Sequence, residues 1–267
     1  MTRKIHPTAI VDPGAELGDG VEIGPFSVIG PNVTVGINTR IAERVSVFGW
    51  TKVGEECEIH PGAVVGGKPQ DLKFKGDRSY VTVGARTVIR ESVTIHRATF
   101  EGEETQVGGG CLLMAYSHVA HNCVVGDGVI LGNSVALAGH VTIEDEAVIG
   151  GLTGIHQFVR VGYRAYVGGM AAIRLDVLPF TLSGGQPCRL LGLNVIGLRR
   201  KGYSQEEIDE LQKAYRILFR EGYTENQAVD RLRGHFPDSA DIGRIIDFVS
   251  RSERGLTRPL GGASATE

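Results

Sequence analysis

The aliphatic positions of this chain repeat every six residues. Stepping by six from Ile5 to Ile173 gives Val, Ile or Leu at 26 of 29 positions, and the three exceptions, Asp71, Asp77 and Glu101, are acidic. Glycine often follows the aliphatic residue, and a small or β-branched residue stands four positions after it. A period of six fits neither an α-helix nor a long strand, but it is typical of short strands joined by tight corners.

Stacked hexapeptides of this kind form a parallel β-helix, because each coil can bury its aliphatic side chains only against its neighbours. We therefore predict an all-β solenoid over residues 1–178, followed by a small C-terminal α-helical cap. Two polar stretches, 67–82 and 96–106, interrupt the repeat, and the register resumes in phase after each. They predict loops that leave the solenoid, and such loops often carry function.

The pattern becomes helical after the last hexapeptide. The sequences Ser-Gln-Glu-Glu at 204–207 and Thr-Glu-Asn-Gln at 224–227 are typical of capping boxes at helix N-termini. We predict three helices, at about 204–221, 224–235 and 238–251. Residues 179–258 are assigned to a linker and a helical domain, and residues 259–267 to a disordered tail.

Composition excludes several classes of protein. Glycine is unusually frequent, at 38 of 267 residues, which fits many regular corners, and the net charge of −3 argues against non-specific nucleic-acid binding. The chain has neither a signal-peptide pattern nor a run of about 18 apolar residues, so we expect a cytoplasmic protein. Its four cysteines lack CxxC spacing, which gives no support for a disulfide framework or a cysteine zinc site.

Histidines gather where the solenoid needs none. If each coil holds 18 residues, positions 18 apart lie about 4.8 Å apart on successive coils. His121 then aligns with Gly139 and Gln157, and Asn122 aligns with His140. The segments 118–122, 138–140 and 156–158 therefore form one patch, which lies at corners and faces out of the solenoid.

Three interpretations of this patch compete. It is a polar surface that a neighbouring subunit covers, or a metal site held by His118, His121 and His140. The third interpretation makes one histidine a general base, with the unhindered backbone N–H of Gly139 beside it for a developing oxyanion. The convergence of three polar segments favours chemistry over a plain surface.

The sequence also resembles a known family between about residues 5 and 258. The segments "RESVTIHRAT", "HVAHNCVVG", "LAGHVTI", "GGLTGIHQFVRVG" and "GLNVIGLRRKG" are similar to the UDP-N-acetylglucosamine O-acyltransferases of lipid A biosynthesis. The resemblance implies a left-handed β-helix and a cytoplasmic homotrimer with active sites between subunits. It also implies transfer of a 3-hydroxyacyl chain from acyl carrier protein to the glucosamine 3-hydroxyl, with no cofactor or metal.

Residue roles carried over from the family follow the matching motifs. The resemblance makes His121 the general base and the Gly139 N–H the oxyanion donor. Substrate-binding residues would be Gln70, Asp71, Lys73, His118, His140, His156, Gln157, Asn194, Arg200 and Lys201. Gly169 would limit acyl length, and a glycine there leaves room for a longer chain, which the neighbouring Met170 could shorten.

This sequence departs from the family at three positions. Asn122 stands where an acidic residue often follows the catalytic histidine, Ile196 stands where a carboxylate contacts the nucleotide, and Lys201 replaces a common arginine. An amide can orient an imidazole but cannot stabilise an imidazolium as a carboxylate does. The departure therefore leaves the partner of His121 open.

Other functions remain to be distinguished. The N-acyltransferase of the same pathway carries an extra domain before its hexapeptides, whereas here they begin at Ile5. A γ-type carbonic anhydrase would bind zinc, and an ice-binding β-helix would show threonine ladders. The sequence leaves acyl length and the acceptor, hydroxyl or amine, open.

A set of basic residues has two equally compatible interpretations: a docking surface for acyl carrier protein, or an ordinary solvated face. The set comprises Arg189, Arg199, Arg200, Lys201 and Arg216.

Overall fold

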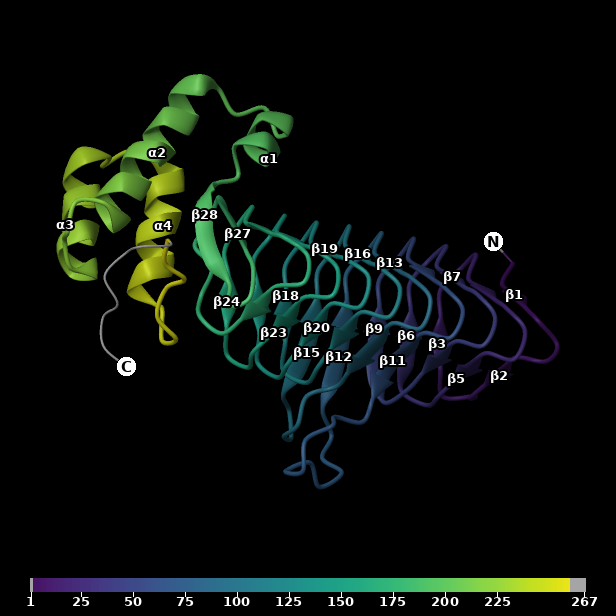
Figure 1. Ribbon diagram of the computed structural model, residues 1–267. Helices are drawn as coiled ribbons and strands as arrows, with labels where there is room; N and C mark the ends of the chain where they lie inside the picture. Colours follow the sequence, from purple (N-terminus) through teal and green to yellow (C-terminus); the bar gives the residue numbers. More distant parts are fainter. Residues whose placement is uncertain (1, 260–267) are drawn as a thin grey trace.

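The computed structural model describes residues 2–259, which form a β-helix with helices packed at its C-terminal end (Figure 1). Three sheets make the sides of the prism in this part of the chain, and each coil contributes one short strand to each sheet. Neighbouring strands of a sheet are parallel throughout, except the last pair of sheet A. The predicted left-handed parallel β-helix is confirmed.

The strands are short, as corners every six residues require. Sheet A contains, in spatial order, β1 (Lys4–Ile5), β4 (Glu22–Ile23), β7 (Arg40–Ile41), β10 (Glu58–Ile59), β13 (Val88–Ile89), β16 (Leu112–Leu113), β19 (Ile130–Leu131), β22 (Val148–Ile149), β25 (Tyr166–Val167), β27 (Thr181–Gly184) and β28 (Arg189–Leu193). Sheet B contains β2 (Ile10–Val11), β5 (Val28–Ile29), β8 (Ser46–Val47), β11 (Val64–Gly67), β14 (Thr94–His96), β17 (His118–Val119), β20 (Ala136–Leu137), β23 (Gly154–Ile155) and β26 (Ala172–Ile173). Sheet C contains β3 (Glu16–Leu17), β6 (Val33–Val35), β9 (Trp50–Val53), β12 (Tyr80–Val83), β15 (Glu104–Val107), β18 (Val124–Val125), β21 (Thr142–Ile143) and β24 (Arg160–Val161).

The coil length is 18 residues wherever the repeat is uninterrupted. His118 pairs with Ala136, which pairs with Gly154. Across the two interruptions the offset between paired residues is larger: Glu58 pairs with Val88, and Thr94 pairs with His118. The extra residues leave the prism as two loops that project together from one corner (Figure 1). The core therefore continues in register past both.

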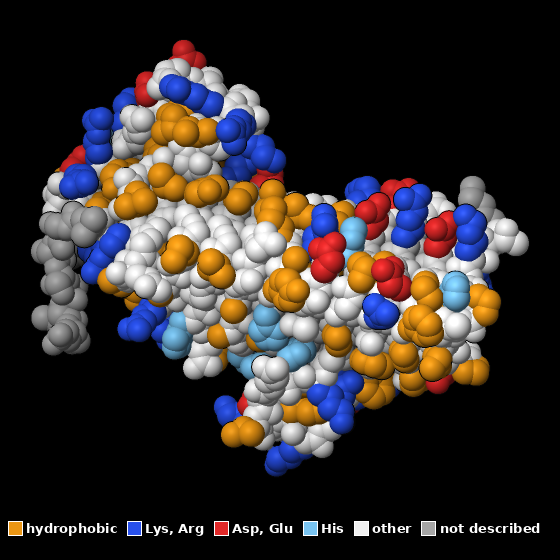
Figure 2. Space-filling model, turned by 45° about the vertical axis from the view of Figure 1, so that its right-hand side comes forward, with side chains coloured by type: hydrophobic (Ala, Val, Ile, Leu, Met, Phe, Trp, Pro, Cys, Tyr) orange, Lys and Arg blue, Asp and Glu red, His pale blue; other side chains and the backbone are white. Residues whose placement is uncertain are grey.

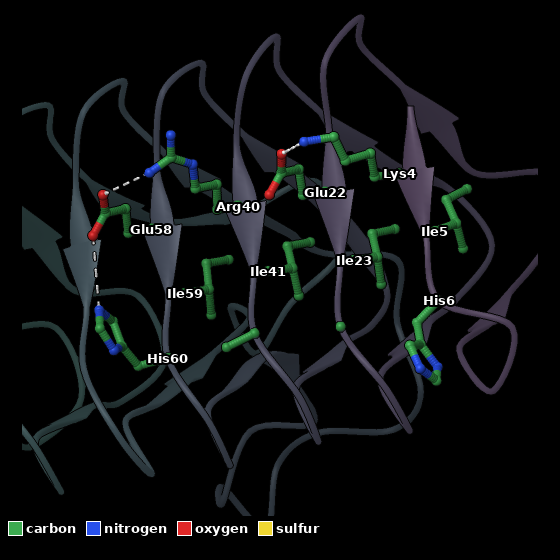
Figure 3. Close-up of a pocket in the computed structure, with 12 residues that line it drawn as sticks. Lys4, Ile5, His6, Glu22, Ile23, Arg40, Ile41, Glu58, Ile59 and His60 are labelled. Carbon is green, nitrogen blue, oxygen red and sulfur yellow. Dashed lines mark hydrogen bonds and ion pairs between the residues drawn. The ribbon is translucent and has the colours of Figure 1, made fainter. Parts of the chain in front are cut away.

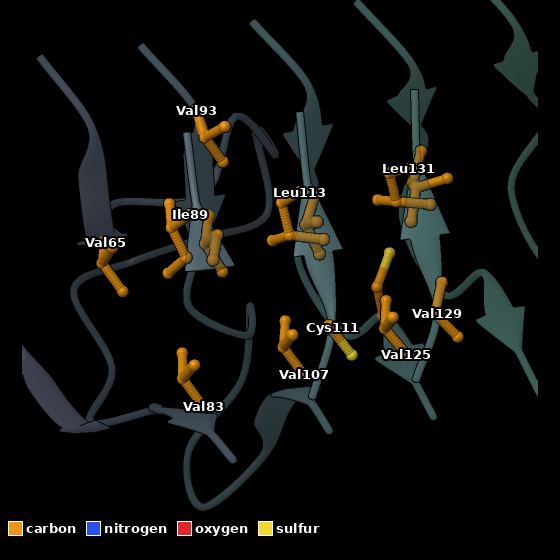
Figure 4. Packing of buried hydrophobic residues seen from close by; sticks show 14 of the residues in the cluster. Val65, Val83, Ile89, Val93, Val107, Cys111, Leu113, Val125, Val129 and Leu131 are labelled. Atoms are coloured by element: carbon orange, nitrogen blue, oxygen red, sulfur yellow. The ribbon is translucent and has the colours of Figure 1, made fainter. Parts of the chain in front are cut away.

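The aliphatic residues of the six-residue repeat form the core of the prism. Only Ile5 and Val11, at the open N-terminal end, are not buried. The second column, which includes Cys111 and Val129, points inward beside them (Figure 4). Burial of one such side chain contributes roughly 1.5–3 kcal/mol, so the ladder is the main source of cohesion between coils.

The C-terminal region differs in part from the prediction. The three predicted helices are present as α2 (Gln205–Phe219), α3 (Glu225–His235) and α4 (Ala240–Ser250), and both capping boxes form. The stretch expected to be a linker instead contains β27, β28 and the short helix α1 (Val195–Arg200). Sheet A thus extends beyond residue 178, because β27 still pairs with β25.

The first residue of the predicted tail is not disordered. Pro259 forms a β-bridge with Leu190, so it belongs to the folded chain. Residues 260–267, the rest of the predicted tail, lie outside the described residues. None of the helices in the described chain is long and apolar enough to span a membrane.

Glycines at the corners give a testable measure of how closely the coils stack. A Cβ on Gly150 would lie 2.3 Å from the backbone nitrogen of Gly169, whereas a Cβ on Gly168, one coil later, would meet nothing closer than 3.7 Å. We expect Gly150→Ala to lower the free energy of unfolding by roughly 1–3 kcal/mol and Gly168→Ala to leave it nearly unchanged. Thermal unfolding followed by circular dichroism checks this, and equal midpoints for the two variants would contradict it.

Candidate active site

A groove of about 530 Å³ runs across the outer face of sheet B. Small residues at successive outward positions form its floor: Ala136 in β20, Gly154 in β23 and Ala172 in β26. His118 and His121 lie at one end, beside the projecting loops. Histidine side chains gather at this place on the surface (Figure 2). The groove can therefore hold an extended apolar chain, with imidazoles where that chain would end.

His121 lies on the corner between sheets B and C, two residues after the end of β17. Its Nδ1 is 3.0 Å from Oδ1 of Asn122, and its Nε2 is 3.9 Å from Oδ2 of Asp71. The imidazole is mostly buried, with 16% of the side chain exposed. One ring nitrogen is thus held by the protein, while the other faces the groove and the first loop.

Gly139 lies directly against this imidazole on the next coil. A Cβ at Gly139 would come within 2.5 Å of His121 Nε2, so only glycine allows the ring to lie there. The Gly139 carbonyl accepts a hydrogen bond from Phe158 N–H, but in the described chain its own N–H has no acceptor. An unpaired N–H beside a histidine nitrogen is what an acyl-transfer site needs.

The two projecting loops converge on His121. In the first loop, Asp71 Oδ1 accepts a hydrogen bond from the Lys73 N–H at 3.0 Å. That bond, together with the Thr99 hydroxyl and the nearby His121, holds the pKa of the Asp71 carboxyl below its usual range. In the second loop, Thr99 donates its hydroxyl to Asp71 at 3.1 Å and its N–H to Asn122 Oδ1 at 3.1 Å. The first loop therefore places a carboxylate near one ring nitrogen, and the second loop holds the Asn122 amide that faces the other.

Burial keeps two further histidines neutral. Burial, and then the neighbouring His118 and His121, lower the pKa of His96 to about 4. Burial, then His121, also lowers the pKa of His118, whose Nδ1 is 2.7 Å from the Thr94 hydroxyl. The rings of His96 and His118 meet edge to face at 4.8 Å. Neutral imidazoles here can orient a substrate without adding charge.

The second and third coils of the patch complete the cluster. His140 meets His121 edge to face at 5.3 Å and stacks on Phe158 at 4.7 Å. Burial and the nearby His121 lower the pKa of His140. His156 lines the groove, and its Nδ1 is 3.1 Å from the Gln157 carbonyl. The alignment of positions 121, 139 and 157 predicted from the 18-residue coil is present.

Three of the predicted substrate-binding residues lie elsewhere in the chain. Asn194, Arg200 and Lys201 line a second hollow, of about 750 Å³, between α1 and the outer face of sheet A. The Asn194 side chain caps α1 by accepting from Gly197 N–H at 3.1 Å. Lys201 Nζ is 2.5 Å from Oε2 of Glu146, and the Arg164 and Lys201 side chains lower the pKa of Glu146 to about 2. Within one chain these residues do not reach His121.

The remaining predicted residues are close to the groove without forming the cluster. Gln70 lines the groove, and Lys73 is exposed in the first loop. Gly169 and Met170 lie on the corner between β25 and β26, just before the groove residue Ala172. Met170 is 67% exposed.

A third hollow, of about 540 Å³, lies over the N-terminal strands of sheet A (Figure 3). Its outward charges alternate from coil to coil, with Lys4 2.7 Å from Glu22 and Arg40 3.9 Å from Glu58. The hydrogen bond and charge of Lys4 lower the pKa of the Glu22 carboxyl. These four charged side chains therefore pair with one another across successive coils.

The metal interpretation finds no support in the geometry. Among residues 2–259, no three His, Cys, Asp or Glu side chains are arranged to hold a metal ion.

The sequence analysis missed three residues around His121, namely Thr99, Glu103 and His96. The only signal for them was their place within or at the edge of the second interruption, since loop contacts follow no period.

Comparisons with known proteins agree along nearly the whole chain. The family described as Udp N-acetylglucosamine O-acyltransferase, Domain 2, matches residues 176–257, and Bacterial transferase hexapeptide (six repeats) matches residues 104–139. The acyl-[acyl-carrier-protein]–UDP-N-acetylglucosamine O-acyltransferase of Fusobacterium nucleatum is 54% identical over 254 residues, covering 95% of this chain and 99% of the relative. The protein of that name from Thermodesulfovibrio yellowstonii is 44% identical, covering 96% and 99%. The crystal structure of the UDP-N-acetylglucosamine acyltransferase from Bacteroides fragilis 9343 has a TM-score of 0.91 and 41% identity, covering 95% of this chain and 99% of that one.

The buried His96 makes stability depend on pH in a direction that can be tested. Between about pH 4 and 6.5 the unfolded chain binds a proton at this histidine that the folded chain does not. The free energy of unfolding therefore falls as the pH falls through that window. We expect His96→Gln to show a smaller drop in unfolding midpoint between neutral and mildly acidic pH than the parent protein. His6→Gln, at an exposed histidine, is the control, and identical drops for both variants would disprove the assignment.

Proposed function

The chain belongs to the UDP-N-acetylglucosamine O-acyltransferase family, and from this membership and the geometry of the groove we propose that His121 is its general base. The protein is an acyltransferase that moves an acyl chain from acyl carrier protein to UDP-N-acetylglucosamine in lipid A biosynthesis. The relatives are named as O-acyltransferases, which favours a hydroxyl over an amine as the acceptor. We take that acceptor to be the glucosamine 3-hydroxyl and the acyl group to be a 3-hydroxyacyl chain.

One observation carries the proposal: His121 Nε2 and the unpaired Gly139 N–H lie together at the end of the groove. The neutral imidazole removes the proton of the sugar hydroxyl while that oxygen attacks the thioester carbonyl. The Gly139 N–H then donates a hydrogen bond to the oxyanion that forms on the carbonyl oxygen. When the C–S bond breaks, the imidazolium returns its proton to the departing thiolate.

The neighbouring side chains suit the remaining parts of the substrates. Asp71 is held in its charged form and can accept hydrogen bonds from sugar hydroxyls, while Gln70 and Lys73 lie in the same loop. His118, His140, His156 and Gln157 offer hydrogen-bond donors and acceptors around the reacting centre. The floor of Ala136, Gly154 and Ala172 fits an acyl chain, because no side chain interrupts it. We propose that Gly169 and Met170 limit the length of that chain.

A homotrimer would bring the two separated sets of residues together. A nucleotide diphosphate needs cations, yet Arg200 and Lys201 lie against sheet A, on another side of the prism from the groove. In a ring of identical subunits, a surface of one subunit faces a different surface of the next. We propose that Asn194, Arg200 and Lys201 of one subunit complete the site of its neighbour.

The basic residues of the C-terminal region suit an acidic partner. Arg189, Arg199, Arg200, Lys201 and Arg216 are all exposed. Arg216 lines a hollow with Leu193, Val195 and Tyr215, so cations and apolar side chains stand side by side. We propose this surface as the docking site for acyl carrier protein. The two substrates support the proposal that the enzyme works in the cytoplasm.

The role of His121 is tested by replacing it. Purified protein is incubated with UDP-N-acetylglucosamine and a panel of 3-hydroxyacyl carrier proteins, and product is measured by mass spectrometry. Loss of a general base costs roughly 10²–10⁴-fold, so we expect His121→Ala to lose at least that much kcat. His6→Ala, at an exposed position on the first coil, should keep full activity. Comparable rates for His121→Ala and the parent would remove His121 as the base.

The shared site is tested by mixing two inactive subunits. We expect His121→Ala and Arg200→Ala to be inactive alone, and their co-purified mixed trimers to recover about a third of the parent activity, because every trimer that contains both variants has one intact intersubunit site out of three. Differently tagged subunits isolate the mixed species. Activity no higher than that of the separate variants would place both residues in a site within one chain.

A further inference from the structure

The carboxylate that often follows the catalytic histidine in this family is missing here, since Asn122 occupies that position. A general base still needs one tautomer and one ring orientation, and its imidazolium needs negative charge nearby. The hydrogen bonds around Asn122 show where that charge lies: the carboxylate is on the far side of Asn122 from His121.

The orientation of the Asn122 amide follows from its two outer partners. Thr99 N–H lies 3.1 Å from one terminal atom, which must therefore be the accepting oxygen, Oδ1. Oε2 of Glu103 lies 2.7 Å from the other, which must be the donating Nδ2. Reversing the amide would set a donor against a donor and an acceptor against an acceptor.

This orientation fixes the tautomer of His121. Oδ1 of Asn122 faces His121 Nδ1 at 3.0 Å, and an amide oxygen can only accept. Nδ1 must therefore carry the proton, which leaves the lone pair on Nε2, the nitrogen beside Gly139. The amide thus points the basic nitrogen at the groove.

From these contacts we propose that Glu103 is the positioning residue for His121, acting through Asn122. Its carboxylate fixes the Asn122 amide and polarises it, because hydrogen bonds to a charged acceptor are stronger and reinforce the next bond in a chain. The negative charge thereby reaches His121 indirectly and favours its imidazolium during proton transfer. This inference rests on the proposed role of His121 and adds a residue that never touches the substrate.

The placement of Glu103 favours this role over one in which its carboxylate only anchors the second loop. Glu103 is half-buried at the end of the second loop, directly before β15, where the rigid prism resumes. The hydroxyl of Thr105 in β15 accepts the backbone N–H of Asn122 at 2.8 Å. Asn122 is therefore held from two sides, so a change in the charge of Glu103 acts on an amide that stays in place.

A charge-neutral replacement separates polarisation from simple contact. Glu103→Gln keeps the size and an accepting oxygen, so the loop can stay in place while the charge is lost. We expect kcat to fall about tenfold, equivalent to 1.4 kcal/mol, with less than about a twofold change in KM for UDP-N-acetylglucosamine. Glu101→Gln is the matched control in the same loop, because its carboxylate accepts Arg78 N–H at 2.7 Å and does not contact Asn122. That control should keep the parent kcat.

Restoring the charge at the inner position provides the rescue. Asn122→Asp in the Glu103→Gln background places a carboxylate directly against His121 Nδ1, and we expect kcat to return to within about threefold of the parent. Asn122→Asp alone sets two carboxylates against each other, so it should be slower than the double variant. A purely structural role for Glu103 predicts the opposite order, with the double variant worst.

A substrate-free measurement keeps the test independent of the proposed reaction. Diethylpyrocarbonate acylates the free lone pair of a neutral imidazole, and fragment mass spectra locate the label on His121. We expect a labelling rate about threefold lower in Glu103→Gln than in the parent or Glu101→Gln, because a less polarised partner leaves Nε2 less nucleophilic. Parent protein that labels as expected but forms no product would refute the proposed function alone. Equal labelling and equal kcat for the two glutamine variants would refute the relay.

Discussion

The structure depends on the parallel pairing of each coil with the next, which lies 18 residues away wherever the repeat is uninterrupted. Backbone bonds such as Gly126 N–H to the Ile143 carbonyl, at 2.8 Å, fix this offset, and the buried aliphatic ladder makes any slip costly. A shift by one residue would turn the core side chains outward. Because the inward positions are fixed, the outward and corner positions are fixed with them. The prism therefore holds His121, Gly139 and Gln157 in line without any contact designed for that purpose alone.

The fixed register of the coils also determines where the two interruptions leave the prism. Each adds residues without disturbing the register, so both loops emerge from neighbouring coils and fold over one corner. The first brings Asp71 towards Nε2 of His121, and the second brings Thr99 and Glu103 to Asn122. A rigid frame with loops attached at fixed points is a common way to hold reacting groups within a fraction of an ångström. In the proposed mechanism the frame supplies the base and the oxyanion donor, and the loops supply the charges.

Burial and hydrogen bonding set the charges of the side chains in the cluster. His96, His118 and His140 are driven towards their neutral forms by loss of water, while Asp71 is kept charged by hydrogen bonds. Such a site can bind polar sugar groups without accumulating positive charge around His121, which must itself become cationic if it acts as the proposed base. The cations Arg200 and Lys201 lie apart, against sheet A, where the Lys201 ammonium already offsets the Glu146 carboxylate.

The sequence by itself determined the solenoid, the alignment of the histidine patch and the three long C-terminal helices, because a six-residue period and capping boxes are local patterns that a linear reading can count. It could not show that β27 and β28 extend sheet A, since those strands leave the hexapeptide register. Nor could it separate Arg200 from His121, because the two lie on different faces of the prism. The partners of Asn122 were decided by tertiary structure alone: Thr99 and Glu103 belong to a loop without periodicity, and only its path over the corner brings their hydrogen-bonding groups to the amide.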